Sequence, residues 1–138
     1  MTKGIRERIE KGADKAPAPS VRFTTGSTLL DLVIGGGKGV IGLKGGTLVR
    51  FVAVNSGGKS SLATEMLAHN IRKGPKGFWH EYLDREYRFA FDSKGIYGVD
   101  MNVLGVDKCP RTVEELSGHL GIALKEAKGP GIVVIDSL

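Results

Sequence analysis

Cysteine is nearly absent from this sequence, because Cys109 is the only one among 138 residues. A single thiol excludes a disulfide framework and a cysteine metal cluster, and we expect Cys109 to be a small buried side chain. The three histidines, His69, His80 and His119, lack the spacing of metal ligands. The sequence also lacks an apolar run long enough to cross a bilayer and an apolar signal core at its N-terminus. These absences predict a cytoplasmic protein with no membrane partner.

The overall composition is typical of one soluble globular domain. Apolar residues make up 41% of the chain and charged residues 25%. The 21 glycines indicate tight turns or close contacts between the backbone and a ligand. The net charge of +5 fits a polyanionic partner such as a nucleotide or nucleic acid, although many soluble domains are mildly basic.

Residues 1–20 differ in composition from the rest of the chain. They are basic and end in Ala16-Pro17-Ala18-Pro19, which indicates a linker. Two interpretations of this segment stay open: a frayed tail, or an arm that docks on a neighbouring subunit. We expect the folded domain to span residues 21–138.

Strand and helix patterns alternate along residues 21–138, which predicts βαβ units and a mostly parallel sheet with flanking helices. The runs at 47–54 and 132–135 are nearly continuous and β-branched, as in buried parallel strands. The expected strands are 21–25, 47–54, 77–83, 101–106 and 132–135, and the expected helices are 28–34, 59–71 and 113–127.

Capping residues and apolar stripes support the expected helices. Ser27 can cap the first helix, and Thr112 with Glu115 forms a capping box for the third. The apolar stripe of the second helix is Leu62, Ala63, Met66, Leu67 and Ile71, and that of the third is Val113, Leu116, Leu120, Ala123, Leu124 and Ala127.

A phosphate-binding pattern lies between the expected strand at 47–54 and the helix that follows it. Residues 53–60 (AVNSGGKS) have the P-loop form G-x-x-x-x-G-K-[ST], with Ala53 in place of the first glycine. Backbone amides at a helix N-terminus bind phosphate oxygens. Lys59 can reach the β- and γ-phosphates, and Ser60 can offer its hydroxyl to Mg²⁺. The alternative is a coincidental glycine-rich turn. The expected nucleotide-binding residues are Asn55, Ser56, Gly57, Gly58, Lys59, Ser60 and Ser61.

Asp136 directly follows the apolar strand at 132–135, in the form of a Walker B strand. Its carboxylate would lie at the carboxyl end of that strand, where ligands bind in open α/β sheets. We expect Asp136 to hold Mg²⁺ through water, together with Ser60. The alternative is an ordinary aspartate at the end of a strand.

Together these residues resemble the RecA family of recombinases, including its phage-encoded members, over residues 21–138. The P-loop is common to many NTPases, whereas the ordered set that includes Asp-x-Glu and Gly-Val-Asp is much more specific. The matching segments, in family order, are 25–31 (TGSTLLD), 55–61 (NSGGKSS), 82–87 (YLDREY), 98–100 (GVD) and 133–137 (VVIDS).

The resemblance implies a RecA-like P-loop NTPase core that uses ATP and Mg²⁺. Glu86 matches the family's catalytic glutamate, which polarises the attacking water, and Lys59 matches the phosphate-binding lysine. A solvated surface acid is the alternative for Glu86. The family places an aromatic ring over adenine at a position that aligns with Ser93, and Tyr97 is nearby.

The resemblance further implies the ATP-binding part of a DNA-dependent ATPase that acts in homologous recombination and DNA repair. Its partners would be single-stranded DNA and further copies of the chain in an oligomer or filament. Two alternatives stay open. One is a non-catalytic module that binds nucleotide or occupies a subunit interface, and the other is a segment of a replicative-helicase-type ATPase.

The sequence ends just after the expected Walker B strand. In the family, the mobile DNA-binding loops and the remaining strands come later, so DNA contact is not placed on these residues. We expect a fragment, one half of a split gene or a truncated product, with ATPase activity only when it is completed. An open sheet edge predicts marginal stability or self-association.

Overall fold

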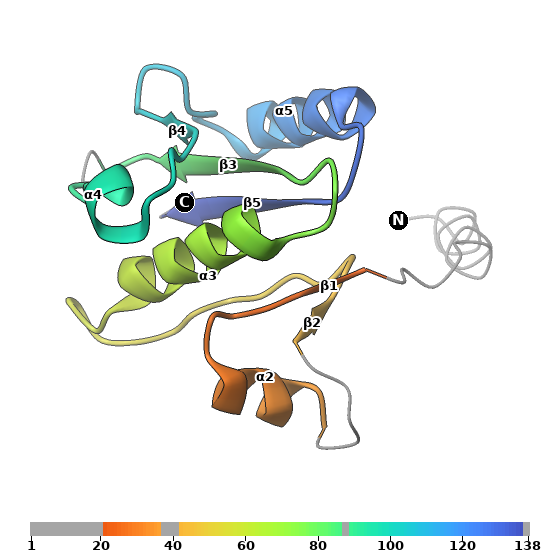
Figure 1. The fold of residues 1–138 in the computed structure, drawn as a ribbon. Helices are drawn as coiled ribbons and strands as arrows, with labels where there is room; N and C mark the ends of the chain where they lie inside the picture. The colour runs from red at the N-terminus through yellow and green to blue at the C-terminus, as the bar shows by residue number, and fades with distance from the viewer. Residues whose placement is uncertain (1–20, 37–41, 87–88, 137–138) are drawn as a thin grey trace, which may run out of the picture.

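The computed structural model describes residues 21–36, 42–86 and 89–136, so the predicted tail or arm at 1–20 lies outside the described residues. Its centre is a parallel sheet of three strands in the order β4-β3-β5 (Figure 1). The strands are β3 (Trp79–Asp84), β4 (Val103–Leu104) and β5 (Gly131–Asp136). A mixed α/β fold with a parallel sheet and flanking helices is therefore confirmed, and these three strands lie where the sequence predicts them.

Two long helices, α3 (Lys59–Lys73) and α5 (Val113–Glu126), cover opposite faces of this sheet. Successive strand residues point to opposite faces. Tyr82 and Ser60 of α3 both donate a hydrogen bond to Asp136. The neighbouring residue Glu81 instead contacts His119 of α5. The shorter helix α4 (Ser93–Tyr97) lies near the carboxyl ends of the strands (Figure 1). No helix within the described ranges has the length and apolar character that crossing a membrane requires.

Helix α3 carries more of the buried apolar side chains than any other described element. Ala63, Met66 and Leu67 of the predicted stripe are buried, while Leu62 and Ile71 are half-buried. Met66 packs with Phe23 and Leu43, which belong to the antiparallel ribbon of β1 (Arg22–Phe23) and β2 (Leu43–Lys44). The half-buried side chains around this cluster are Val21, Phe51, Phe78 and Ile132.

Helix α2 (Thr28–Ile34) begins after Ser27, whose hydroxyl accepts a hydrogen bond from the Leu30 amide as predicted. The buried side chain of α2 is a polar one, Asp31. Asp31 is 2% exposed, whereas Leu29 and Val33 are 74% and 69% exposed. The Asp31 carboxylate accepts hydrogen bonds from the Thr25 amide and hydroxyl, each at 2.7 Å. Helix α2 is therefore attached through a polar network, and its apolar side chains face outward.

Asn70 of α3 joins the helix to the segment after β1. Its side-chain amide donates to the Thr24 carbonyl at 2.7 Å, and its oxygen accepts from the Thr24 amide at 3.2 Å. Thr24 in turn donates its hydroxyl to the carboxylate of Asp31. Both backbone groups of the half-buried Thr24 are therefore hydrogen-bonded, as peptide groups removed from water require.

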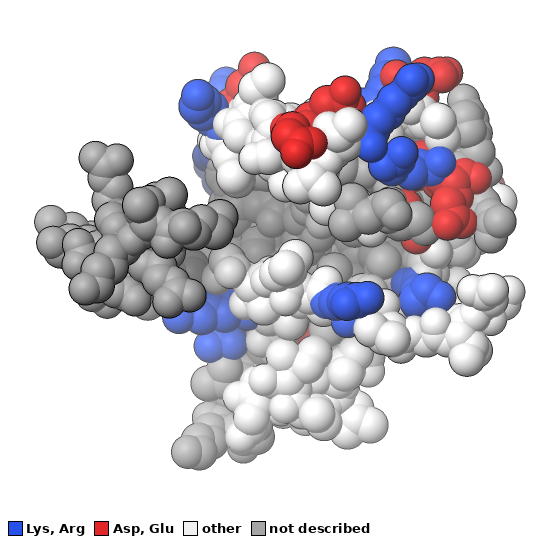
Figure 2. Space-filling model, turned by 180° about the vertical axis from the view of Figure 1, so that it is seen from behind, with Lys and Arg blue, Asp and Glu red and all other residues white. Residues whose placement is uncertain are grey.

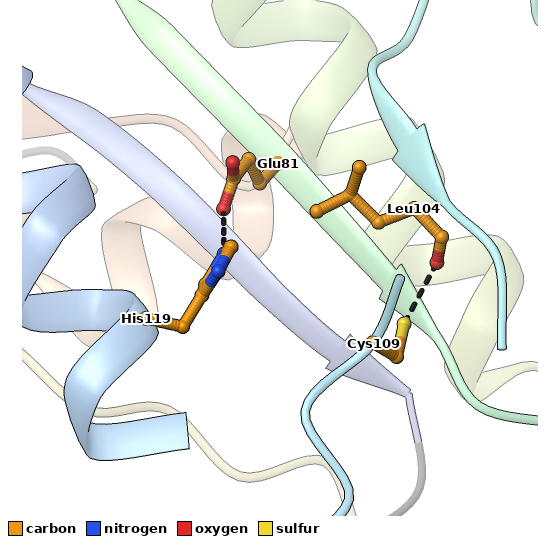
Figure 3. A network of polar contacts seen from close by, with 4 residues as sticks. All are labelled: Glu81, Leu104, Cys109 and His119. Carbon is orange, nitrogen blue, oxygen red and sulfur yellow. Dashed lines mark hydrogen bonds and ion pairs between the residues drawn. The ribbon is translucent and has the colours of Figure 1, made fainter. Parts of the chain in front are cut away.

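Helix α5 is attached by polar contacts as well as by apolar ones. His119 of α5 and Glu81 of β3 lie 2.8 Å apart (Figure 3). In the segment before the helix, the buried Cys109 thiol donates to the carbonyl of Leu104 in β4 at 2.8 Å. Thr112 caps the helix as predicted, although Glu115 accepts from the Arg111 amide rather than from that of Thr112.

The predicted apolar stripe of α5 is only partly correct. Leu116, Leu120, Ala123 and Ala127 are half-buried, but Val113 and Leu124 are 72% and 68% exposed. His119, which lies between Leu116 and Leu120 in the sequence, takes part of the surface facing the sheet. Helical spacing therefore predicted the sheet-facing side of α5 in part, whereas two of the six stripe positions are exposed.

The predicted strand at 47–54 is wrong. Within the described residues this segment belongs to no strand, and only Phe51 packs against the core. Leu48, Val52 and Val54 are 94%, 80% and 80% exposed. A β-branched run becomes a strand only where a neighbouring strand satisfies its backbone groups, and no described strand lies beside this one.

Gly131, the first residue of β5, has no room for a side chain. An added Cβ would lie 2.5 Å from the Trp79 carbonyl oxygen and closer still to the indole ring. Gly131→Ala must therefore push β5 away from β3, and we expect it to lower the free energy of unfolding by about 2 kcal/mol. Urea denaturation followed by circular dichroism measures this. As a control, Gly118→Ala on α5 adds a methyl group where nothing lies within 4 Å, so it should not destabilise.

Candidate functional site

The loop before α3 is tightly curved. Ser56 and Gly58 both have left-handed backbones, with φ of 58° and 78°, and the Gly57 amide donates to the Val54 carbonyl at 3.0 Å. Gly57 lies so close to the preceding chain that an added Cβ would be 2.8 Å from the Val54 oxygen. Lys59 then begins the helix. The loop thus has the curved form that a phosphate-binding loop requires, rather than an extended one.

This curvature produces a small open pocket at the N-terminus of α3. Its volume is about 190 Å³. A helix N-terminus carries partial positive charge and unpaired amides, so the pocket is suited to an anion. Six of the seven predicted nucleotide-binding residues line it, whereas Asn55 is exposed beside it. The lining residues are Ser56, Gly57, Gly58, Lys59, Ser60 and Ser61.

The Lys59 side chain folds back along the loop. Its Nζ donates to the carbonyls of Val54 at 3.1 Å and of Ala53 at 3.3 Å. The ammonium is therefore held at the wall of the pocket by neutral acceptors. An anion in the pocket would compete with these carbonyls for the ammonium, because an ionised acceptor adds charge–charge attraction that a neutral carbonyl does not supply.

Ser60 and Asp136 meet at the carboxyl end of β5, although they are 76 positions apart in the sequence. The Ser60 hydroxyl donates to Oδ2 of Asp136 at 2.8 Å. Tyr82 donates its hydroxyl to the same oxygen at 2.6 Å. The predicted proximity of Ser60 and Asp136 at this edge of the sheet is therefore observed.

Tyr82 is a member of this cluster that the sequence analysis did not identify. It is fully buried, and its burial together with the nearby Asp136 carboxylate raises the pKa of the phenol. The hydroxyl therefore stays protonated and remains a donor to Asp136. The sequence could have pointed to Tyr82, because a tyrosine in a strand expected to be buried needs a hydrogen-bond partner for its phenol.

Asp84 and Glu86 lie at the end of β3, next to β5. Asp84 is in register with Asp136, is buried, and accepts from the Phe89 amide at 2.9 Å. Glu86 follows two residues later with an exposed side chain and does not line the pocket. Glu86 therefore lies just beyond the carboxyl end of β3 and outside the pocket.

Aromatic side chains gather near this edge without lining the pocket. Phe89 stacks edge-on to Tyr82 with ring centroids 4.8 Å apart, and Phe91 packs on Phe89 at 5.5 Å. Ser93, which aligns with the family's adenine-contacting position, and Tyr97 are half-buried at the two ends of α4, and neither is a lining residue.

The oxygen donors at this edge fit Mg²⁺ better than a soft metal. Across residues 21–36, 42–86 and 89–136, no three His, Cys, Asp or Glu side chains form a metal-binding group. Magnesium bound with a nucleotide needs fewer protein ligands, commonly one or two carboxylates, with phosphates and waters completing the shell. The hydroxyl of Ser60 and the carboxylate of Asp136, already 2.8 Å apart, meet that requirement.

No protein-family model, curated protein or solved structure matches this chain. The site is therefore defined by its own geometry. Its three components are the curved loop at the N-terminus of α3, the Lys59 ammonium at the wall of the pocket, and the Ser60–Asp136 pair at the end of β5.

Proposed function

We propose that residues 21–138 are the ATP-binding part of a RecA-like, DNA-dependent ATPase that acts in homologous recombination and DNA repair. The observation that carries the proposal is the hydrogen bond between Ser60 and Asp136. It joins the loop with P-loop sequence to the end of a parallel strand, which is where open α/β sheets bind their ligands. A coincidental glycine-rich turn has no reason to bring its serine to a strand-end carboxylate.

The pocket binds the triphosphate in this proposal. Amides of Ser56, Gly58, Lys59 and Ser60 at the N-terminus of α3 donate to phosphate oxygens, and the helix dipole adds to their attraction. Lys59 leaves the carbonyls of Ala53 and Val54 and pairs with the β- and γ-phosphates. The left-handed backbone of Gly58 changes the direction of the chain directly before α3 begins, beside the proposed position of the phosphates.

Ser60 and Asp136 would hold Mg²⁺, which neutralises phosphate charge when it is bound. Ser60 would direct its hydroxyl oxygen to the ion, and Asp136 would accept from a coordinating water. Tyr82 keeps the carboxylate oriented through its own hydrogen bond to Oδ2. Glu86, at the neighbouring strand end, would orient the attacking water and accept its proton.

Single-stranded DNA and further copies of the chain are the proposed macromolecular partners. The net charge of +5 favours a polyanion. The basic side chains Arg72, Lys73 and Lys76 lie at or just after the end of α3, where cations also complement the helix dipole. They therefore do not by themselves indicate a DNA-binding surface, and DNA binding is assigned to the assembled protein.

A second candidate is a module that binds nucleotide without turnover. The exposure of Glu86 and its position outside the pocket favour this candidate for the isolated chain. In that case the loop and Lys59 would still bind phosphate, but water would not be oriented for attack. The two candidates therefore predict the same binding and different hydrolysis.

Titration with a fluorescent ATP analogue, with and without Mg²⁺, tests the proposal. We expect Mg²⁺ to strengthen binding about tenfold, and Ser60→Ala or Asp136→Asn to remove most of that gain, which is about 1.4 kcal/mol. Ser117→Ala, which removes an exposed hydroxyl from α5, is the matched control.

Hydrolysis measured with and without single-stranded DNA then separates the two candidates. Stimulation by DNA supports the ATPase, and binding without hydrolysis supports the non-catalytic module. If the analogue does not bind in either condition, both candidates are wrong.

A further inference from the structure

A second pocket lies between β1 and the carboxyl end of α3, at the opposite end of this helix from the proposed nucleotide site. Its volume is about 430 Å³, more than twice that of the pocket before α3, and lies in the range of pockets that bind small organic ligands. Two cationic side chains, Arg22 and Lys73, line it together with the apolar side chains of Val21, Phe23 and Pro75. None of its lining residues is acidic.

The uncharged polar groups of this pocket are already engaged. The side chain of Asn70 is hydrogen-bonded to both backbone groups of Thr24, and the Thr24 hydroxyl donates to a carboxylate of α2. The two cations are less committed. Arg22 donates from one guanidinium nitrogen to the Gly42 carbonyl at 3.2 Å, and the Lys73 ammonium forms no ion pair within the described ranges. Polar recognition of a ligand would therefore come from the remaining donors of Arg22 and from Lys73.

The ribbon of β1 and β2 places a third cation beside Arg22. Arg22 is directly opposite Lys44 in the antiparallel register, and both side chains are exposed. Residues that are directly opposite share one face of a ribbon, and like charges there are destabilising. Neither cation has an acidic partner within the described ranges. This repulsion has no structural benefit in the chain alone, whereas a bound anion would relieve it.

Acidic side chains are scarce around this pocket. Residues 42–64 and 70–78 contain several lysines and arginines but no aspartate or glutamate. Figure 2 shows the same separation, because acidic side chains gather in the upper part of the molecule, whereas the charged side chains of the lower part, which contains the ribbon, are almost all basic. The carboxyl end of α3 contributes about half a negative charge, which the three cations outweigh. The pocket therefore favours an anion.

We propose that this pocket binds the phosphate group of an organic phosphate ester. The phosphate lies between Arg22, Lys44 and Lys73. It suits three cations better than a carboxylate does, because it presents more oxygens and the guanidinium can donate to two of them in parallel. The organic part of the ligand packs against Val21 and Pro75, which an inorganic ion would leave uncovered. Small phosphate esters and the backbone of single-stranded nucleic acid both present this group, and titration with each distinguishes the two sources.

NMR titrations of the 138-residue chain test the site. The probes are inorganic phosphate, deoxythymidine monophosphate, a single-stranded oligothymidylate and triglutamate. We expect the two esters to shift the amides of Arg22, Phe23 and Gly74 and to bind about tenfold more tightly than inorganic phosphate or triglutamate. Equal binding of both esters identifies a small ester as the ligand, whereas tighter, strongly salt-dependent binding of the oligothymidylate identifies a nucleic-acid backbone. Amides of residues 56–60 report binding at the nucleotide site separately.

Two variants change the cations at this pocket. Lys44→Glu places an opposite charge beside Arg22, so the affinity for both esters should fall more than about tenfold while the urea midpoint of unfolding rises. Arg22→Gln should weaken binding about tenfold as well. Lys125→Glu makes the same charge change at an exposed position of α5 and is the matched control, with an affinity within about twofold of the unmodified chain.

Three results would overturn the proposal. The first is that neither ester shifts the amides that line the pocket, even if those of residues 56–60 respond. The second is that triglutamate or inorganic phosphate binds as tightly as the esters, which would reduce the site to general attraction of anions. The third is an equal loss of affinity in Lys44→Glu and Lys125→Glu, because net charge alone would then explain the binding.

Discussion

Replacing Lys59 with alanine is expected to weaken the binding of Mg²⁺-ATP about 100-fold. Two charge-assisted hydrogen bonds to phosphate would be lost, which together contribute about 3 kcal/mol. Stability should change little, because Nζ donates in this structure only to loop carbonyls next to the pocket. Isothermal titration calorimetry measures the affinity, and urea denaturation checks the fold.

Lys73→Ala is the matched control for Lys59→Ala. Lys73 ends the same helix at its other terminus, so the variant removes the same charge without touching the pocket. We expect its affinity for Mg²⁺-ATP to stay within about twofold of the unmodified chain, since exposed charges interact weakly at a distance. If both variants lost affinity equally, attraction would come from net charge and the P-loop assignment would fail.

The second large effect is expected for Asp31→Ala, which should lower the free energy of unfolding by about 3 kcal/mol. Asp31 is buried and accepts from the backbone amide and hydroxyl of Thr25 and from the hydroxyl of Thr24. Removing the carboxylate leaves the buried Thr25 amide without its acceptor and the Thr25 hydroxyl with only the Ser27 carbonyl at 3.3 Å, and it weakens the attachment of α2 to the segment after β1. Urea denaturation at pH 7 measures the change.

Acid gives an independent test of the Asp31 network. Burial by itself would raise the pKa of Asp31, but the hydrogen bonds from Thr24 and Thr25 outweigh it and lower the pKa below its ordinary 3.8. The stabilisation is therefore complete above pH 3.8 and is lost as the pH falls through the lower pKa of the folded state. Asp31→Asn cannot titrate. The difference in free energy of unfolding between this variant and the unmodified chain should therefore shrink as the pH falls through the pKa of Asp31 in the folded state. A constant deficit would exclude a role for the charge.

Local signals predicted three of the four described helices, α2, α3 and α5, but not the short helix α4. Ser27 and Thr112 cap helices as predicted, and Lys59 begins α3 directly after the glycines. These features depend on residues within a few positions of one another, so they can be recognised from the sequence alone. The position of β3 was predicted to within two residues for the same reason.

The candidate site could be predicted in part. The meeting of Ser60 and Asp136 follows from chain order, because a helix N-terminus and the carboxyl end of a parallel strand lie at one edge of a βαβ unit. The hydroxyl of Tyr82 in the same cluster could not be predicted, since it depends on which strand lies beside β5. The position of Glu86 outside the pocket also depends on how the chain leaves β3.

Two similar apolar runs show where the sequence becomes insufficient. Residues 47–54 and 132–135 have the same β-branched character, yet only the second forms a strand, because β3 lies beside it. Helix α2 shows the same limit, since it buries Asp31 and exposes Leu29.

The sequence by itself determined the alternation of helices and strands, the helix caps and the curved loop of residues 56–60, because each depends on neighbours in the chain. Only the tertiary structure decided which strands pair and which face of a helix is covered. Both are settled by hydrogen-bond partners and packing surfaces that lie far away in the sequence.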